Sequence, residues 1–315
     1  MSPAPRCLSS LIAASSPSAA FLGGQSFAGR WLPGSTAKIR ARPPASVYAV
    51  NLANARHLRF STMSAAQEAT PPTPSAELAV EGVPAALESV RRRVADAAVS
   101  SGRAHTPPRL VAVSKTKPLE ALMAAYDAGQ RVFGENYVQE LLDKAPAMPE
   151  DVKWHFIGHI QSNKAKSLVM GVPNLSVVET VDSIKLAGKL DAACKAAERS
   201  DSLGVYLQVD TSGEDTKSGV APKDCPSLAR QVADSFSALR VSGLMTIGAP
   251  GDEGAFARLA SCREEVAAAL GVEASALDLS MGMSGDFEAA IAAGSTNVRV
   301  GSTIFGARHY PNRSA

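Results

Sequence analysis

The sequence predicts a single (β/α)8 barrel of the TIM type, preceded by an extra helix and a disordered leader. From about residue 80, short runs of β-branched and other apolar residues alternate with Ala- and Leu-rich segments of helical periodicity. Eight such runs fall within about 235 residues, which fits a closed barrel better than an open doubly wound sheet, because open sheets commonly have fewer strands. The 315-residue chain is 45% hydrophobic, which suffices for a sizeable core but not for two large domains.

The elements are expected to follow one another in regular order. A helix over residues 83–100 should come first and pack on the barrel, and a helix that begins at Pro118 should follow the first strand. The eight predicted strands cover residues 109–115, 131–135, 154–158, 176–181, 205–210, 241–247, 277–281 and 298–301. Further predicted helices lie between these strands, among them residues 183–199, 222–238, 252–270 and 286–293.

Residues 1–67 differ from the rest of the chain in their charge. They contain no Asp or Glu but seven basic residues, which leaves 25 basic and 30 acidic residues in the remainder, a net charge of −5 there. An acid-free, Arg-containing leader that is rich in Ser and Ala indicates an organellar transit peptide, not a nucleic-acid-binding arm. Residues 56–62 (RHLRFST) resemble a mitochondrial processing region, although plastid presequences share this composition.

Two alternatives for the leader stay open: an ordinary disordered tail and an over-extended gene model. A second start at Met63 would give a cytosolic form. Residues 68–80, which include three prolines, are interpreted as a flexible linker, and residues 81–315 as the barrel domain.

The sequence argues against several other classes of protein. No stretch approaches the eighteen or more apolar residues of a membrane span, so we expect a soluble domain without membrane or nucleic-acid partners. The four cysteines are widely spaced and suggest neither a disulfide framework nor a zinc site. His155 and His159 lack a nearby carboxylate in the sequence, and no metal site is expected.

Lys115 is the first candidate functional residue, because it closes the apolar run of residues 109–115 directly before the helix at Pro118. In a barrel of this kind the chemistry lies at the carboxyl ends of the strands. Burial disfavours the charged form of an amine, which makes Lys115 a candidate nucleophile. The alternative is a lysine that extends to the surface.

The loops after strands seven and eight predict a phosphate site. Barrels often bind phosphate there through backbone N–H groups and a helix N-terminus. Ser280 and Ser284 can add hydroxyl donors, and Gly301 and Ser302 let the backbone approach an anion closely. The alternative is that these residues serve turns and helix capping. A strand-end lysine that faces a phosphate site suggests a phosphorylated aldehyde, and pyridoxal 5'-phosphate (PLP), the vitamin B6 cofactor, satisfies both requirements.

The local motifs closely resemble those of the pyridoxal phosphate homeostasis protein family, whose barrels are related to the N-terminal domain of alanine racemase. The matching segments are residues 112–118 (AVSKTKP), 133–140 (FGENYVQE), 154–164 (WHFIGHIQSNK), 217–219 (KSG), 243–245 (GLM), 280–284 (SMGMS) and 298–306 (VRVGSTIFG). They occur in order from about residue 109 to 310, and the leader lies outside them.

The resemblance implies a role for each candidate residue. Lys115 would form the Schiff base with the cofactor; Lys117 is the competing choice, but beside Pro118 it should be better solvated and more fully protonated. The residues implied to hold the phosphate are Ser280, Ser284, Gly301 and Ser302, although the family often has Thr where Ser302 stands. Asn136 and His155 would line the ring, and Arg299 would face the pyridine nitrogen.

Arg299 has a chemical consequence in this interpretation. A guanidinium cannot accept a hydrogen bond from a pyridinium, so it disfavours protonation of the ring nitrogen and weakens the ring as an electron sink. Transamination and β-elimination become less favourable, whereas racemisation is still open. A surface salt bridge would be the alternative role for Arg299, but the flanking Val298 and Val300 argue against it.

A non-catalytic carrier is therefore expected: a monomer that binds, buffers and delivers PLP to apo-enzymes. The last strand ends close to Ala315, and we expect no second domain of the kind that gives alanine racemase its catalytic tyrosine and dimer contacts. A two-base racemase, the first rival, would need a second base such as Tyr137 or His155. A Schiff-base aldolase that uses Lys115 without PLP is the second rival.

Overall fold

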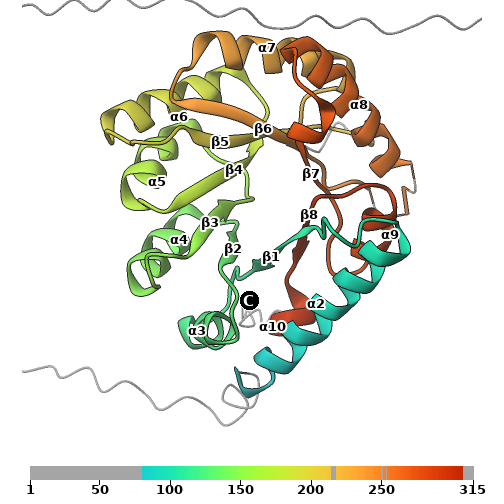
Figure 1. Cartoon of the computed structure of the whole chain (residues 1–315). Helices are drawn as coiled ribbons and strands as arrows, with labels where there is room; N and C mark the ends of the chain where they lie inside the picture. Colours follow the sequence, from blue (N-terminus) through green and yellow to red (C-terminus); the bar gives the residue numbers. More distant parts are fainter. Residues whose placement is uncertain (1–79, 214–217, 250, 253, 308–315) are drawn as a thin grey trace, which may run out of the picture. The chain divides into compact units, whose positions relative to one another are not determined.

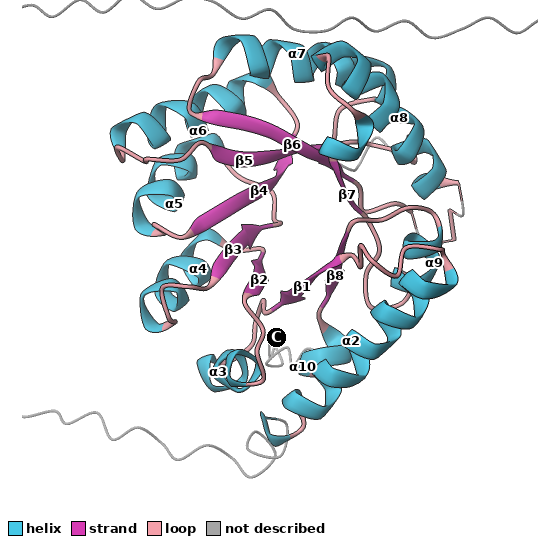
Figure 2. Cartoon of the chain, viewed as in Figure 1, coloured by secondary structure: helices cyan, strands magenta, loops and turns pink. Residues whose placement is uncertain are grey.

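The computed structural model describes residues 80–213, 218–249, 251–252 and 254–307. The leader of residues 1–67 and nearly all of the predicted linker lie outside these residues. Within them, eight parallel strands form a closed barrel in the order β1 to β8, and β1 pairs with β8 to complete it. Helices surround the strands (Figures 1 and 2). The prediction of a single (β/α)8 barrel is confirmed.

The strands are β1 (Arg109–Val113), β2 (Val132–Glu135), β3 (Lys153–Phe156), β4 (Leu175–Val181), β5 (Leu203–Gln208), β6 (Leu239–Met245), β7 (Asp278–Ser280) and β8 (Asn297–Val300). The α-helices are α2 (Val83–Ser100), α3 (Leu119–Asp127), α4 (Val138–Lys144), α5 (Ala165–Gly171), α6 (Ile184–Ala196), α7 (Cys225–Ser235), α8 (Ala255–Leu270), α9 (Phe287–Ala292) and α10 (Ser302–Phe305). Short 3-10 turns lie at Ala145–Ala147, Ser162–Lys164, Pro222–Asp224 and Ala274–Ala276.

Each predicted strand is present, but most end one or two residues earlier than the apolar run predicts. The run that ends at Lys115, for example, gives a strand that ends at Val113. The last residues of such runs belong to the loops at the carboxyl end of the barrel. Residues of β5 are buried throughout, as expected for a parallel strand between helices and a filled interior.

Helix α2 packs on the outside of the barrel, as predicted. Its buried residues lie three or four positions apart and form one apolar stripe: Val83, Leu87, Val90, Val94 and Ala98. The helix lies against α3, α9 and α10. Arg93 of α2 sits over the ring of Phe287, 4.6 Å from the ring centroid, and forms an ion pair with Glu288.

The amino end of the barrel is closed by a polar network. Asp278 at the start of β7 accepts hydrogen bonds from Tyr206 (2.6 Å), Arg109 (2.9 Å) and Thr296 (2.8 Å). Arg109 also donates to the Tyr206 hydroxyl at 2.9 Å. Burial by itself raises the pKa of Asp278, but these hydrogen bonds and the charge of Arg109 bring its pKa below the ordinary value.

Three further findings bear on the classes of protein considered above. Among the described helices, none is long and apolar enough to cross a membrane. In the same part of the chain, no group of three or more His, Cys, Asp or Glu is placed to hold a metal ion. Cys194, Cys225 and Cys262 are buried free thiols, and the Cys262 thiol donates to the carbonyl of Pro222 at 3.7 Å.

Candidate functional site

A cavity of about 310 Å³ opens at the carboxyl end of the barrel. It receives residues from the loops after β1, β2, β3, β6, β7 and β8. Six of the residues singled out in the sequence line it: Lys115, Asn136, Ser284, Arg299, Gly301 and Ser302. An apolar wall of Val113, Ile157, Met245, Ile247 and Met283 completes most of the lining. The volume lies at the lower end of the range typical of small-molecule pockets.

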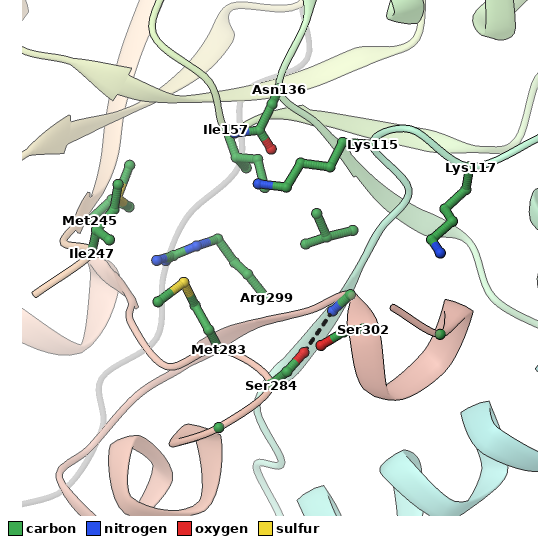
Figure 3. A pocket seen from close by; sticks show the side chains of 14 residues that line it. Lys115, Lys117, Asn136, Ile157, Met245, Ile247, Met283, Ser284, Arg299 and Ser302 are labelled. Atoms are coloured by element: carbon green, nitrogen blue, oxygen red, sulfur yellow. Dashed lines mark hydrogen bonds between the residues drawn. The ribbon is translucent and has the colours of Figure 1, made fainter. Parts of the chain in front are cut away.

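Lys115 reaches into the middle of this cavity. Figure 3 shows its side chain between Asn136 and Ile157 on one side and Arg299 on the other. Lys117 lies apart at the edge of the cavity, where its ammonium group donates to the carbonyl of Ala307 at 2.8 Å. The two lysines therefore occupy different environments, and Lys115 is the one that faces Arg299.

A buried cluster of charges holds the chain on both sides of Lys115. The Lys144 ammonium group donates to the carbonyl of Ser114 (2.8 Å) and to the carboxylates of Glu135 (2.8 Å) and Glu140 (2.6 Å). The Ser114 hydroxyl also donates to Glu135, at 2.7 Å. Burial raises the pKa of Glu135, and the charge of Lys144 opposes this change. The sequence analysis did not identify this cluster.

Thr116 shows that the loop is under constraint. Its φ of 61° lies in the left-handed region, which a β-branched residue rarely adopts. The Thr116 N–H donates to Glu140 Oε1 at 2.6 Å, which fixes this conformation. Ser114 and Thr116 are thus anchored to the same ionic cluster, and Lys115 stands between two fixed neighbours.

Asn136 lines the cavity through a close approach of two loops. A Cβ added at Gly158 would lie 1.9 Å from the Asn136 carbonyl oxygen, so only glycine allows this contact. The Oδ1 atom of Asn136 is buried and has no hydrogen-bond partner among the described residues. Because a buried amide oxygen without a partner is costly, Asn136 offers a hydrogen-bonding position for a ligand in the cavity.

The loops after β7 and β8 meet at the opposite side of the cavity. The Gly301 N–H donates to the Ser284 hydroxyl at 3.1 Å, as the dashed line in Figure 3 marks. A Cβ at Gly301 would lie 3.2 Å from the carbonyl oxygen of Val113, so this loop also approaches β1 closely. The hydroxyls of Ser284 and Ser302 and the backbone of Gly301 and Gly285 together form a small polar concavity suited to an anion.

The structure corrects the prediction for Ser280. This side chain does not reach the cavity wall but is fully buried inside the barrel. Its hydroxyl donates to Glu179 at 2.5 Å and accepts from Arg299 at 2.6 Å and from Asn297 at 3.0 Å. Ser280 is the last residue of β7 and points inward, whereas Ser284 lies in the following loop. Ser280 therefore contacts Arg299 and is not placed to hold a phosphate.

The prediction that His155 lines the cofactor ring is also corrected by the structure. It lies on β3, is 2% exposed, and is not among the residues that line the cavity. Its Nδ1 lies 2.6 Å from Glu179 Oε1, so its ring belongs to the interior network below the cavity. The side chain of Tyr137, the other candidate for a second base, is also absent from the lining and is 56% exposed. Neither rival base lies at the cavity.

Glu179 is the functional residue that sequence reasoning missed. It lies on β4 in the apolar sequence Val177-Val-Glu-Thr-Val181, and a carboxylate in such a run is the signal that could have revealed it. It is fully buried next to Arg299, with 3.9 Å between Arg299 Nη1 and Glu179 Oε2. Burial lowers the pKa of Arg299, and the charge of Glu179 opposes this effect.

The chain is similar to known proteins along most of its barrel domain. Residues 87–309 match the family model of the alanine racemase N-terminal domain. The mouse pyridoxal phosphate homeostasis protein is 46% identical over 248 residues, which are 74% of this chain and 90% of the mouse protein. The Escherichia coli protein of the same name is 42% identical over 235 residues, 72% of this chain and 97% of that protein.

Solved structures show the same relationship. The structure of PipY from Synechococcus elongatus with PLP bound is 34% identical, with a TM-score of 0.54, and the match covers 68% of this chain and 100% of PipY. An alanine racemase from Bartonella henselae shares the fold at 17% identity and a TM-score of 0.54, over 75% of this chain and 61% of the racemase.

Proposed function

The chain belongs to the pyridoxal phosphate homeostasis protein family, and we propose on this basis that it binds PLP in the cavity at the carboxyl end of the barrel. We further propose that it buffers PLP and supplies it to apo-enzymes. The observation that carries the proposal is the convergence of Lys115, Arg299, Ser284 and Gly301 on one cavity of about 310 Å³. A lysine and an anion-binding concavity on opposite walls suit a ligand with an aldehyde at one end and a phosphate at the other.

The residues present fit this cofactor. Bound PLP would supply an aldehyde that forms a Schiff base with an amine and a ring that withdraws electrons. Lys115 is the attachment point, and Ser284, Ser302 and the backbone of Gly301 hold the phosphate. The unpartnered buried oxygen of Asn136 supports a polar contact between its amide and the cofactor. Arg299 would face the ring nitrogen, and its guanidinium cannot accept a hydrogen bond from that nitrogen.

We propose that the protein acts as a carrier and not as a turnover catalyst. Arg299 is held by Ser280, Thr246 and Glu179, so a bound ring whose nitrogen lay against this fixed cation would be a poor electron sink. Among the described residues that line the cavity, only Lys115 and Lys117 could serve as bases. The racemase alternative would therefore have to use Lys117 or a group outside the lining.

Borohydride reduction tests the cofactor assignment. The full-length protein is mixed with PLP, reduced, digested and mapped by mass spectrometry. We expect a pyridoxyl-phosphate adduct on Lys115, loss of this adduct in Lys115→Ala, and its retention in Lys117→Ala, the matched control. Colourless protein without an adduct would contradict the proposal, and an adduct on Lys117 would reassign the attachment point.

Two assays separate the carrier from its rivals. Transfer of bound PLP to an apo-enzyme should be faster than release into buffer; equal rates would support buffering without direct delivery. Incubation of the loaded protein with a single amino-acid enantiomer in deuterated water should leave the α-hydrogen in place, whereas exchange would identify a racemase. We also propose a monomer, and light scattering after size-exclusion chromatography should give the mass of one chain.

A further inference from the structure

Glu179 is the centre of a buried network beneath the cavity and is not among the residues that line it. Its Oε1 atom lies 2.6 Å from His155 Nδ1 and accepts from Asn297 at 3.3 Å. Its Oε2 atom accepts from Ser280 at 2.5 Å. The carboxylate thus joins residues of β3, β7 and β8 from its position on β4. Four strands that are separated in sequence converge on one negative charge.

The chemistry of the groups fixes the direction of each hydrogen bond. A guanidinium can only donate, and an ionised carboxylate can only accept. The Ser280 hydroxyl, which contacts both, must therefore give its one proton to Glu179 and accept from Arg299. The second amino group of Arg299 donates to the carbonyl of Thr246 at 2.8 Å. The guanidinium is held at two points and cannot rotate without breaking one of them.

Charge balance also links Glu179 to Arg299. Arg299 is 4% exposed, and an unpaired buried cation is costly. Glu179 is the one carboxylate that forms a salt bridge with Arg299 among the described residues. Although burial raises its pKa, the contacts with His155, Arg299 and Ser280 together bring the pKa of Glu179 below the ordinary value. The carboxylate is therefore ionised and supplies the counter-charge.

We propose that Glu179 is a positioning residue for the cofactor site: through Ser280 it orients the Arg299 guanidinium toward the ring end of the cavity, and it balances the charge of that guanidinium. This inference rests on the proposed PLP function. It also explains why Ser280 is buried, because its hydroxyl connects the two charged groups. Glu179 itself does not contact the cavity.

The consequence is a change in the electrostatic field at Lys115 when Glu179 is neutralised. In Glu179→Gln the cavity keeps the cation of Arg299 but loses the balancing negative charge. A more positive surrounding disfavours the protonated form of the lysine-bound cofactor. The pH midpoint of the absorbance change of bound PLP should then move downward, by about one pH unit.

The matched control is Asp278→Asn. Asp278 is also a carboxylate in an interior barrel network, with Tyr206, Arg109 and Thr296 as partners, but it lies at the amino end and is absent from the cavity lining. We expect this variant to keep the wild-type midpoint. A midpoint in Glu179→Gln equal to that of the wild type, with PLP still bound, would overturn the inference. Failure of the wild type itself to take up PLP would instead overturn the proposed function.

A double-mutant cycle gives a second readout that needs no PLP. Arg299→Gln removes the guanidinium that faces Glu179 and leaves this buried carboxylate with the His155 contact alone among its ion pairs. Glu179→Gln leaves the buried Arg299 without a carboxylate, so each single variant should unfold more readily than the wild type. The double variant should be more stable than Arg299→Gln alone, because both uncompensated charges are gone. If a single variant fails to fold, recovery of the fold in the double variant is the expected result. If the double variant loses the sum of the unfolding free energies that the two single variants lose, Glu179 and Arg299 are not coupled.

Discussion

At the scale of single residues, the site depends on where each side chain points. Ser280 and Ser284 are four positions apart and chemically identical, yet one hydroxyl contacts Glu179 inside the barrel and the other contacts Gly301 at the cavity. Lys115 and Lys117 differ in the same way: one reaches the centre of the cavity and the other bonds to Ala307 at its edge. The residue types identify these positions as candidates, and the direction in which each side chain points decides its role.

Ser284→Ala tests the phosphate assignment. The variant should bind PLP about 10- to 150-fold more weakly, because a hydrogen bond to a charged group contributes about 1.5–3 kcal/mol. Its affinity for pyridoxal, which lacks the phosphate, should change little. The dissociation constants of both ligands can be measured by absorbance titration. An equal loss of affinity for PLP and pyridoxal would show that Ser284 does not act on the phosphate.

Glu140→Ala tests the cluster around Lys115. The change leaves the Thr116 N–H without its acceptor and removes one of two carboxylates bound to Lys144. We expect the free energy of unfolding in urea to fall by about 1–2 kcal/mol, because Glu140 is partly exposed and its charge is partly screened. The exposed Glu88 on α2 is the matched control, and Glu88→Ala should change stability by less than about 0.5 kcal/mol. Equal effects of the two changes would show that the cluster does not stabilise the loop around Lys115.

At the scale of elements, helix α2 shows how local pattern and packing agree. The sequence predicts residues 83–100, and the structure has Val83–Ser100. An apolar stripe of regular spacing specifies both the helix and the face that it buries. The ends of the strands are predicted less accurately, because an apolar run does not show where strand pairing ends and the loop begins. The apolar run therefore predicts Lys115 as the last residue of a strand, whereas Lys115 lies two residues beyond the end of β1.

Leu87→Ala tests the packing of α2 on the barrel. Leu87 is fully buried, and its truncation should destabilise the protein by about 2–5 kcal/mol through lost apolar burial and the cavity left behind. Val99→Ala, at a residue of the same helix that is 61% exposed, should change stability by less than about 0.5 kcal/mol. Both values can be read from urea unfolding curves. A small effect of Leu87→Ala would mean that α2 contributes little to the stability of the barrel.

At the scale of the whole molecule, two polar networks occupy the barrel interior, and Asn297 joins them, because its Oδ1 accepts from Arg109 at 3.3 Å and its Nδ2 donates to Glu179 at 3.3 Å. The one around Asp278 closes the amino end, and the one around Glu179 lies below the cavity. Closure of the sheet between β1 and β8 brings Arg109 and Asn297 into register, and this pairing holds the first and last strands together. Of the two networks, only the one around Glu179 includes a residue that lines the cavity, Arg299.

The Asp278 network should make stability sensitive to acid. Its pKa is lower in the folded state than in the unfolded chain, so its contribution is complete above the unfolded value and is lost as pH falls through the folded one. We expect the free energy of unfolding to decrease as pH falls below about 4, and the decrease to be less steep in Asp278→Asn. Urea unfolding at several pH values measures both slopes. Identical slopes would show that Asp278 does not contribute to acid sensitivity.

We propose that residues 1–67 direct the chain to an organelle, with the mitochondrion favoured over the plastid. The composition of this segment, with seven basic and no acidic residues, supports the proposal. A fluorescent fusion of the full chain should enter mitochondria, and a fusion that begins at Met63 should remain in the cytosol. The same cytosolic distribution for both fusions would favour an untargeted tail.

The sequence by itself determined the (β/α)8 barrel, the helix before it, the lysine after the first strand and the glycine- and serine-containing loops after the last two. These features follow from patterns within a few neighbouring residues, which the chain displays before it folds. Only the tertiary structure decided the depth of each side chain. Ser280 and His155 point into the interior, where they meet Glu179 and Arg299 from strands distant in sequence, and the closure of the barrel creates this contact. No local pattern encodes which inward-facing residues of separate strands come to share one charge, and for this reason Glu179 was found only in the folded molecule.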